Sequence, residues 1–267
     1  MFTPEAISEL VREIRLEHGL PESPFRIDEV RYDPKGDKLF IIAHDRTDKS
    51  VVIGNSLVIG KLRERLGVRQ VTVYSNLDLE IKRRKLDEAE RLLPKELGFL
   101  RAIIEAERRF PPRKWPEVMG NLKTLVFLSF SAKPLLGFAK ALKLPYEAIG
   151  LKYSFPRLDY EAVEGDLREL FFPDEDRLVR IAGERGARLV LTDFPFPLDE
   201  KEGIYLLNPF RLLHIGFFEL KYLFGFEFPT MVNEEALLEF VAKLTYDGLM
   251  ESTDGAKVVW RYWRRRR

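Results

Sequence analysis

Strand-like and helix-like segments alternate along the second half of the chain, and this alternation restricts the fold more than any other feature of the sequence. Apolar runs typical of buried strands occupy residues 125–130, 148–153, 188–192 and 204–207. Segments with the spacing of amphipathic helices lie between or after them, at 134–142, 174–184 and 234–246. Because parallel strands need crossover connections, the pattern predicts a three-layer α/β domain with a parallel sheet covered by helices.

The first half of the chain has a different pattern and ends at a proline-rich segment, 110–116. A helix is expected from Pro4 to Gly19, followed by a hairpin of two strands at 25–32 and 38–45. After a loop at 46–50 we expect a strand end, a glycine turn, a helix to Leu66 and a strand at 70–74, and then two helices, at 78–93 and 99–109. We therefore predict two domains, a smaller α+β domain over 1–115 and the α/β domain over 116–267.

The amino-acid composition excludes several kinds of chemistry. The 267 residues contain no cysteine, which rules out disulfides, thiolate metal sites, iron–sulfur clusters and a cysteine nucleophile. With three histidines in the chain, a histidine-rich site is hard to assemble, and no metal is expected. Charged residues make up 33% of the chain beside a single glutamine, which is typical of thermophilic proteins.

Over the whole chain the charges nearly cancel. There are 44 basic and 43 acidic side chains, for a formal charge of +1, so no overall field would draw the protein to nucleic acid or to an anionic membrane. The first residues lack a signal-peptide pattern, and no uncharged apolar run approaches ~18 residues. We expect a cytoplasmic protein with no membrane partner, in which any attraction for nucleic acid is local.

Basic side chains gather between residues 46 and 85, where ten of them stand against four acidic ones. The turn Gly54-Asn55-Ser56-Leu57 opens a helix in this segment, and such a turn exposes backbone N–H groups to which a phosphate can bind. The candidate nucleic-acid contacts here are Lys49, Ser50, Gly54, Asn55, Lys61 and Arg63. The alternative is that these charges only solvate an exposed helix.

This segment resembles the KH family of single-stranded nucleic-acid binders. In that family a Val-Ile-Gly strand end and a Gly-x-x-Gly turn precede a helix and a hydrophobic strand. The chain keeps Val52-Ile53-Gly54 and has Leu57 in place of the second glycine. The resemblance implies a KH-like domain that contacts RNA, although Leu57 carries a Cβ where the family brings the RNA backbone close.

Together with the strand at 125–130, the chain is similar to archaeal proteins in which such a region precedes a PP-loop ATP pyrophosphatase domain of the HUP-like kind. In that family the strand leads into Ser-Gly-Gly-x-Asp-Ser, whose glycines wrap the ATP pyrophosphate and whose aspartate faces the metal ion. Aligned on Ser129, this chain has Phe130 and Ser131 for the glycines and Lys133 for the aspartate. A phenyl ring prevents close approach and a lysine replaces a metal ligand with a cation, so ATP cleavage by the family's route is not expected.

An anion site without a metal could survive in this crevice. The hydroxyls of Ser129 and Ser131, the ammonium of Lys133 and the start of a helix offer donors and positive charge, with ATP as the ligand that the resemblance implies. Thr192 and Asp193 end another strand, where related sheets contact their ligands. The alternative is that Phe130 fills the crevice and Asp193 caps a loop.

Two aromatic segments lie toward the C-terminus. Residues 217–228 are rich in phenylalanine, and this density indicates either core packing or the interface of a homodimer. Residues 260–263 run into four arginines, a pairing of rings and cations that grips single-stranded nucleic acid, with Arg264 and Arg265 as the candidate contacts. The alternative for this end is a basic tail that contributes little.

Three functions are compatible with these observations. The one we predict is a nucleotide- or RNA-binding protein, with tRNA as the candidate RNA, that has lost pyrophosphatase activity. The second is an active ATP-dependent tRNA-modifying enzyme in which Lys133 neutralises phosphate and Asp193 holds a metal. The third is a structural partner subunit with 217–228 as its interface.

Overall fold

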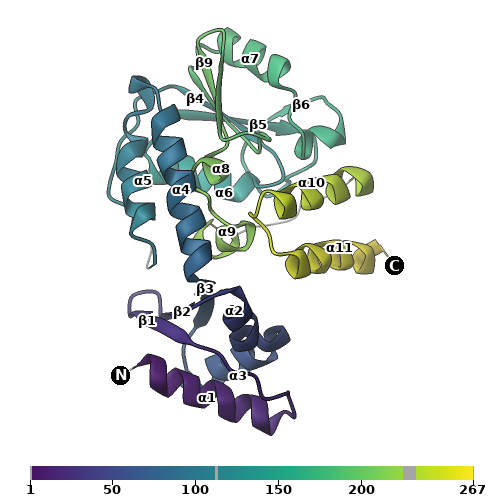
Figure 1. Ribbon diagram of the computed structural model, residues 1–267. Coiled ribbons are helices and arrows are strands. Elements are labelled where there is room, and N and C mark those ends of the chain that lie inside the picture. Colours follow the sequence, from purple (N-terminus) through teal and green to yellow (C-terminus); the bar gives the residue numbers. More distant parts are fainter. Residues whose placement is uncertain (1, 112–113, 225–232, 267) are drawn as a thin grey trace. The chain divides into compact units, whose positions relative to one another are not determined.

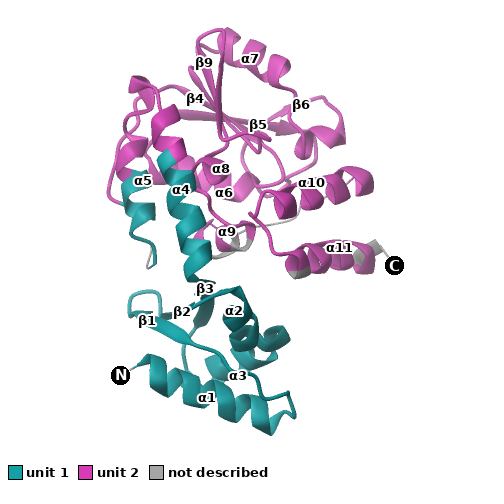
Figure 2. Cartoon of the chain, viewed as in Figure 1, with its two compact units in different colours: residues 1–87, 103–115 teal, residues 88–102, 116–267 magenta. Residues whose placement is uncertain are grey.

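The chain forms two compact units. The computed structural model describes residues 2–111, 114–224 and 233–266 (Figure 1). Unit 1 comprises Met1–Asp87 and Ile103–Trp115, and unit 2 comprises Glu88–Ala102 and Pro116–Arg267 (Figure 2). The chain passes from unit 1 to unit 2 for the last time at the proline-rich segment, but residues 88–102 already belong to unit 2.

Unit 1 is built on a three-stranded sheet in the order β1-β2-β3. Its elements are, in chain order, α1 (Pro4–Glu17), β1 (Ile27–Asp33), β2 (Lys38–Ala43), α2 (Arg46–Ile53), η1 (Gly54–Ser56), α3 (Leu57–Leu66) and β3 (Gln70–Ser75). The strands β1 and β2 pair antiparallel, which confirms the predicted hairpin, and β3 is parallel to β2. The helices α2 and α3 form the crossover that a parallel pair requires.

The core of unit 1 lies between α1, α3 and the sheet. Ile7, Val11 and Ile14 recur at helical spacing along α1 and are buried together with Leu39 and Ile41 of β2. The helix starts at Thr3, whose hydroxyl accepts a hydrogen bond from Ala6 N at 3.2 Å, with Pro4 in its first turn.

Residues 46–53 are helical, which corrects the predicted loop and strand end. Asp45 caps α2 by accepting a hydrogen bond from Asp48 N at 2.8 Å, and Gly54 ends the helix in the left-handed conformation. The run 51–53 suggested a strand because β-branched side chains favour strands. The aspartate cap and the burial of Val52 against the core outweigh that preference.

One of the ten basic residues of segment 46–85 belongs to the core. Lys82 lies on α4 (Asn76–Leu92) and forms a buried ion pair of 2.6 Å with Glu107 of α5 (Leu100–Arg108). The Lys82 ammonium lies 4.7 Å from the ring centroid of Phe110, and the Trp115 indole donates to Glu107 at 2.5 Å. Lys82 therefore stabilises unit 1 and takes no part in a surface site.

Unit 2 contains a six-stranded sheet in the order β6-β5-β4-β7-β9-β8. The strands are β4 (Thr124–Leu128), β5 (Tyr146–Leu151), β6 (Glu161–Val163), β7 (Leu189–Leu191), β8 (Leu198–Lys201) and β9 (Ile204–Leu207). The other elements are η2 (Lys95–Leu97), α6 (Ala132–Ala141), η3 (Leu167–Leu170), α7 (Glu175–Glu184), α8 (Pro209–Leu212), α9 (Phe217–Phe224), α10 (Glu234–Tyr246) and α11 (Ser252–Arg266).

All neighbouring strands of this sheet are parallel except β8 and β9. Figure 1 shows α6 on one face of the sheet and α7 on the other, so the predicted α/β layers are confirmed. The chain moves outward from β4 through β5 to β6 and then returns to β7 on the other side of β4. This order is that of doubly wound sheets, and it places the topological switch point between β4 and β7.

Two edge strands were not predicted. β6 and β8 are short and carry exposed acidic side chains, including Glu161 and Glu200, so they lack the apolar alternation that reveals a half-buried strand. Short charged strands at a sheet edge discourage pairing with other chains.

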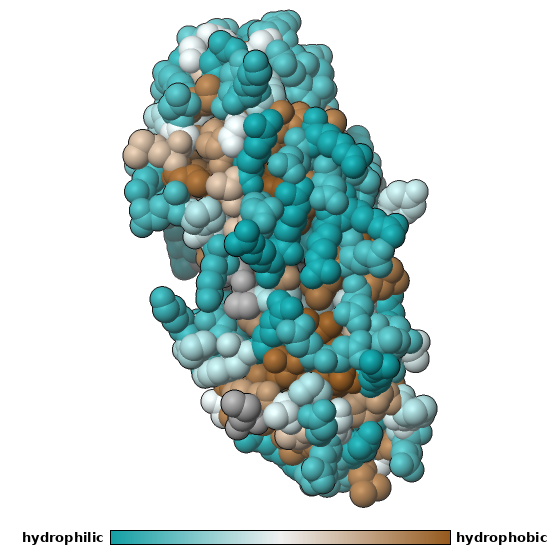
Figure 3. All heavy atoms as spheres, turned by 60° about the vertical axis from the view of Figure 1, so that its left-hand side comes forward, coloured by the Kyte–Doolittle hydropathy of each residue, from teal (hydrophilic) through white to brown (hydrophobic). Residues whose placement is uncertain are grey.

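Hydrophilic side chains cover most of the face that carries α4 and α5, with smaller hydrophobic patches between them (Figure 3). In the part of the chain that the structure describes, no helix combines the length and apolar character needed to cross a membrane.

Candidate functional site

The first candidate site lies at the switch point, where the carboxyl ends of β4 and β7 meet. β4 leads into residues 129–131 before α6 begins, and β7 leads into Thr192 and Asp193. The two strands are in direct register, Thr124 with Leu189 through Val126 with Leu191. Because they run parallel, their ends meet at one edge of the sheet, where doubly wound proteins bind ligands.

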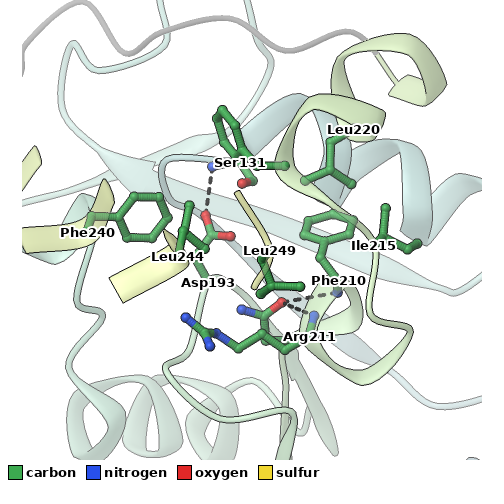
Figure 4. Close-up of a pocket in the computed structure, with 11 residues that line it drawn as sticks. Ser131, Asp193, Phe210, Arg211, Ile215, Leu220, Phe240, Leu244 and Leu249 are labelled. Atoms are coloured by element: carbon green, nitrogen blue, oxygen red, sulfur yellow. Dashed lines mark hydrogen bonds between the residues drawn. The ribbon is translucent and has the colours of Figure 1, made fainter. Parts of the chain in front are cut away.

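The structure brings three of the five predicted nucleotide-binding residues into contact. Ser129 Oγ donates to Asp193 Oδ2 at 2.7 Å. Ser131 N donates to the same oxygen at 2.7 Å, the bond drawn in Figure 4. Asp193 N in turn donates to Ser129 Oγ at 3.3 Å. All three side chains are buried. The carboxylate therefore lies at the start of α6, the position that an anionic ligand of this helix would take.

The backbone N–H groups of residues 130–132 are all bonded to oxygens of the protein. Phe130 N donates to Leu170 O at 2.7 Å, Ser131 N to Asp193, and Ala132 N to Ser129 O at 3.1 Å. Here no N–H of residues 130–132 is left to donate to a phosphate.

Burial raises the pKa of the Asp193 carboxyl above its ordinary value, and the hydrogen bonds from Ser129 and Ser131 oppose this rise only in part. Among the described residues, no three histidine, aspartate or glutamate side chains come together as a metal site would require.

Phenylalanine rings fill the space above this strand end. Phe130 is fully buried, and its ring centroid lies 5.2 Å from that of Phe171, 5.5 Å from that of Phe217 and 4.9 Å from that of Phe240. Phe217 comes from α9 and Phe240 from α10, so the C-terminal helices of unit 2 cover the switch point. Of the two alternatives drawn from the sequence, an open anion site and a crevice filled by Phe130, the structure has the second.

A small cavity of about 20 Å³ remains beside Asp193, which is room for about one water molecule. Ser131, Asp193, Asn208, Arg211 and seven apolar side chains line it (Figure 4). Drug-sized ligands occupy pockets of about 300–1,000 Å³. The crevice as it stands therefore has no room for a nucleotide.

Two of the four polar lining residues, Asn208 and Arg211, were not predicted from the sequence. Asn208 Oδ1 accepts hydrogen bonds from Phe210 N and Arg211 N, both at 3.1 Å, and caps α8. Arg211 forms an ion pair with Asp247, and its Nε is buried without a hydrogen-bond partner among the described residues. An asparagine before a proline is a helix-start signal that could have located Asn208, whereas nothing in the sequence points to Arg211.

The remaining predicted residues of this site lie at its margin. Thr192 is buried, and its N donates to Leu207 O at 3.2 Å. Lys133 is half-buried in the first turn of α6. Neither side chain lines the cavity.

The Phe-rich region 217–228 is only partly described. Phe217 lies in the ring cluster above Phe130, and Leu220 of the same helix lines the cavity. The side chains of Phe218 and Tyr222 and all of 225–228 lie outside the described residues, so the dimer interface predicted there stays a prediction.

The second candidate site is the turn that joins α2 to α3. Gly54, Asn55 and Ser56 all have left-handed backbone conformations, with φ of 50°, 53° and 70°. Ser56 makes no capping hydrogen bond with its side chain, and the turn residues are half-buried to exposed. The N–H of Leu57, the first residue of α3, already donates to Gly54 O, so this helix start is partly satisfied within the turn itself.

Most cations near this turn are paired with acids. Lys49 is bonded to Asp78 at 2.9 Å and Lys61 to Glu64 at 2.9 Å, while Ser50 Oγ donates to Arg46 O at 2.9 Å. Arg63 is exposed, and no acidic side chain within the described ranges forms an ion pair with it. Of the predicted contacts, Arg63 is the one most available to a phosphate.

Gly54 is required by the fold itself. Its φ is +50°, and an added Cβ would lie 2.2 Å from Val58 Cγ2. Gly54→Ala is expected to lower the free energy of unfolding by about 1–2 kcal/mol, because left-handed backbone and a buried clash both oppose the methyl group.

The matched control for Gly54→Ala is Gly60→Ala in α3, where an added Cβ meets nothing within 4 Å. That change is expected to stabilise unit 1 by about 0.5–1 kcal/mol. Urea unfolding measures the free energy of unfolding of both variants. Equal changes in Gly54→Ala and Gly60→Ala would contradict the expectation.

The third candidate site is α11 at the end of unit 2. Trp260 and Trp263 are 56% and 48% exposed, and the Arg264 guanidinium lies 5.2 Å from the Trp260 ring centroid. Trp263 Nε1 donates to Glu234 Oε1 of α10 at 2.9 Å. The Arg265 side chain lies outside the described residues.

No protein-family model, curated protein or solved structure matches the chain.

Proposed function

We propose that this chain binds RNA and that its α/β unit, related to PP-loop ATP pyrophosphatases, has no pyrophosphatase activity. The loss of ATP chemistry rests on one observation, the internal use of the backbone N–H groups of residues 130–132. The strand order, with its switch point at the former cradle, supports the relationship to nucleotide-binding sheets.

The turn between α2 and α3 supports RNA binding through unit 1. It keeps the first glycine of the KH-like signature, opens α3, and has the exposed cation Arg63 two turns into the helix. KH domains hold the nucleic-acid backbone with such a turn. The departure at Leu57, which is partly exposed, favours weak contact with the sugar–phosphate chain over tight recognition of bases.

The competing proposal is an active ATP-dependent enzyme with Asp193 as the metal ligand. Against it, Asp193 is buried, bonded to two serines and raised in pKa. Isothermal titration with ATP and magnesium decides between the two proposals. We expect no heat of binding and no pyrophosphate release, with or without tRNA. Turnover that disappears in Ser129→Ala would overturn our proposal.

Binding of tRNA is expected to fall with salt and to depend on Arg63. Arg63→Ala should reduce the slope of log K against log salt concentration by about 0.7, because one phosphate contact is lost. Lys35→Ala, at an exposed position in the β1–β2 turn, removes the same charge away from the α2–α3 turn and should leave the slope unchanged. Filter binding at three salt concentrations measures both. Equal slopes for the two variants would show that the turn is not the contact.

A further inference from the structure

The outward face of α11 combines exposed indole rings with two arginines that pair with no acid among the described residues, whereas Lys257 pairs with Asp254 at 3.0 Å. From Lys257 to the end of the chain the sequence contains six basic residues and no acidic one. Arg261 and Arg264 are exposed, and neither forms an ion pair with an acidic side chain of the described residues. Arg264 instead lies over the ring of Trp260.

The apolar face of α11 is already occupied. Gly255, Val258 and Tyr262 recur at helical spacing and are buried, and α11 lies beside α10 (Figure 1). A Cβ added at Gly255 would lie 2.9 Å from Val241 Cγ1, so this glycine lets the two helices approach closely. The indole rings of Trp260 and Trp263 are therefore not part of the face by which α11 packs.

The second tryptophan has a defined orientation. Trp263 is anchored by its bond to Glu234, one helical turn from Trp260. Rings that are half exposed, restrained and three residues apart present flat surfaces separated along the helix by about 4.5 Å. Such surfaces suit the stacking of planar groups in succession.

We propose that this face, defined by Trp260, Trp263, Arg261 and Arg264, stacks the bases of single-stranded RNA while its arginines contact the phosphates. Aromatic side chains beside cations are the common means by which proteins hold unpaired strands, and Arg264 stacked on Trp260 adds cation–π attraction at the ring. The inference rests on the proposed function and names the form of RNA and a second place where it binds.

Two other occupants fit the face less well. A bilayer would require an apolar face separate from the cations, but the exposed indole rings of α11 stand among arginines on the same face, and its valines are buried or half-buried. A second copy packed symmetrically would place the same arginines opposite one another without acids between them. Single-stranded RNA offers planar bases to the indole rings and phosphates to the arginines.

The test uses the full chain and a fluorescein-labelled oligouridylate of about twelve nucleotides, within the span of known single-strand sites. Trp260→Leu is expected to weaken binding about 5- to 150-fold, because one base loses its stacking partner. Trp260→Phe keeps an aromatic face and should remain within about threefold of the unchanged chain. If Trp260→Leu binds the oligonucleotide as tightly as Trp260→Phe, stacking of a base on residue 260 is excluded.

The matched control is Tyr153→Ala. Tyr153 is 70% exposed and lies under the Lys152 ammonium at 5.2 Å, so it repeats the ring–cation pair, but Lys152 also faces Glu164 at 3.9 Å. We expect no change in affinity. Quenching of tryptophan fluorescence by the oligonucleotide should disappear in the double variant W260F/W263F, which retains Trp115, while its melting temperature is unchanged.

The outcomes separate the two proposals. If the full chain binds no RNA, both fail. If it binds RNA and Arg63→Ala weakens binding while Trp260→Leu does not, RNA binding stands and the α11 inference is overturned. Binding to phosphatidylserine vesicles that weakens in Trp260→Ala, while RNA binding of that variant is unchanged, would assign the face to a membrane and overturn the inference as well.

Discussion

Replacing Asp193 with alanine is expected to lower the free energy of unfolding by about 2–5 kcal/mol, because two buried donors lose their acceptor. Ser129 Oγ and Ser131 N both donate to Asp193 Oδ2 at 2.7 Å. The cavity beside them holds about one water molecule, which could satisfy one donor and would bring the loss toward the lower figure. Urea unfolding at neutral pH measures the change.

Asp193→Asn is the matched control, since an amide oxygen can accept both bonds without a charge. Burial raises the pKa of Asp193, so the folded chain keeps this proton at pH values where the unfolded chain has released it. The unfolding free energy of the natural chain therefore contains a contribution that is present below about pH 4 and is lost as the pH rises toward the folded pKa.

The asparagine variant lacks this contribution to the pH dependence. Relative to the natural chain, Asp193→Asn is expected to gain stability steadily as the pH is raised from 4. Unfolding curves at several pH values compare the two. A variant that loses stability at high pH would show that the charged carboxylate is favoured by its surroundings, as a ligand site would require.

The sequence pattern predicted the elements whose faces are buried. The β1–β2 hairpin, the strands β4, β7 and β9 and the helix α10 were all expected within a few residues of their observed bounds. In each, apolar spacing and a turn or cap residue indicate the same structure. α2 was missed because its β-branched run outweighed a capping signal at Asp45, and β8 because an exposed edge strand needs no apolar alternation.

The state of the crevice could be predicted only in part. The alternative in which the crevice is filled followed from the bulk of one side chain, Phe130. Asp193, which accepts the hydrogen bonds of Ser129 and Ser131, lies 64 residues after Ser129, and the rings of Phe217 and Phe240 that cover the crevice come from α9 and α10. Contacts across such separations follow from the sheet topology, which local patterns leave undetermined.

Replacing Phe130 with alanine is expected to cost about 3–5 kcal/mol of unfolding free energy, because a fully buried ring leaves a cavity within a cluster of three others. Phe172→Ala is the neighbouring control. Phe172 is half-buried, with the Arg168 guanidinium over its ring, and should cost about 1 kcal/mol.

The Phe130→Ala variant also distinguishes two features that could exclude a nucleotide from the crevice, the Phe130 ring and the internally bonded N–H groups. Removing the ring opens space, but the N–H groups of Ser131 and Ala132 remain bonded to Asp193 and Ser129. We therefore expect the folded variant to bind no ATP in calorimetry. If it does bind ATP, the ring alone excludes the nucleotide, and the internal carboxylate is an acceptor that a phosphate can displace.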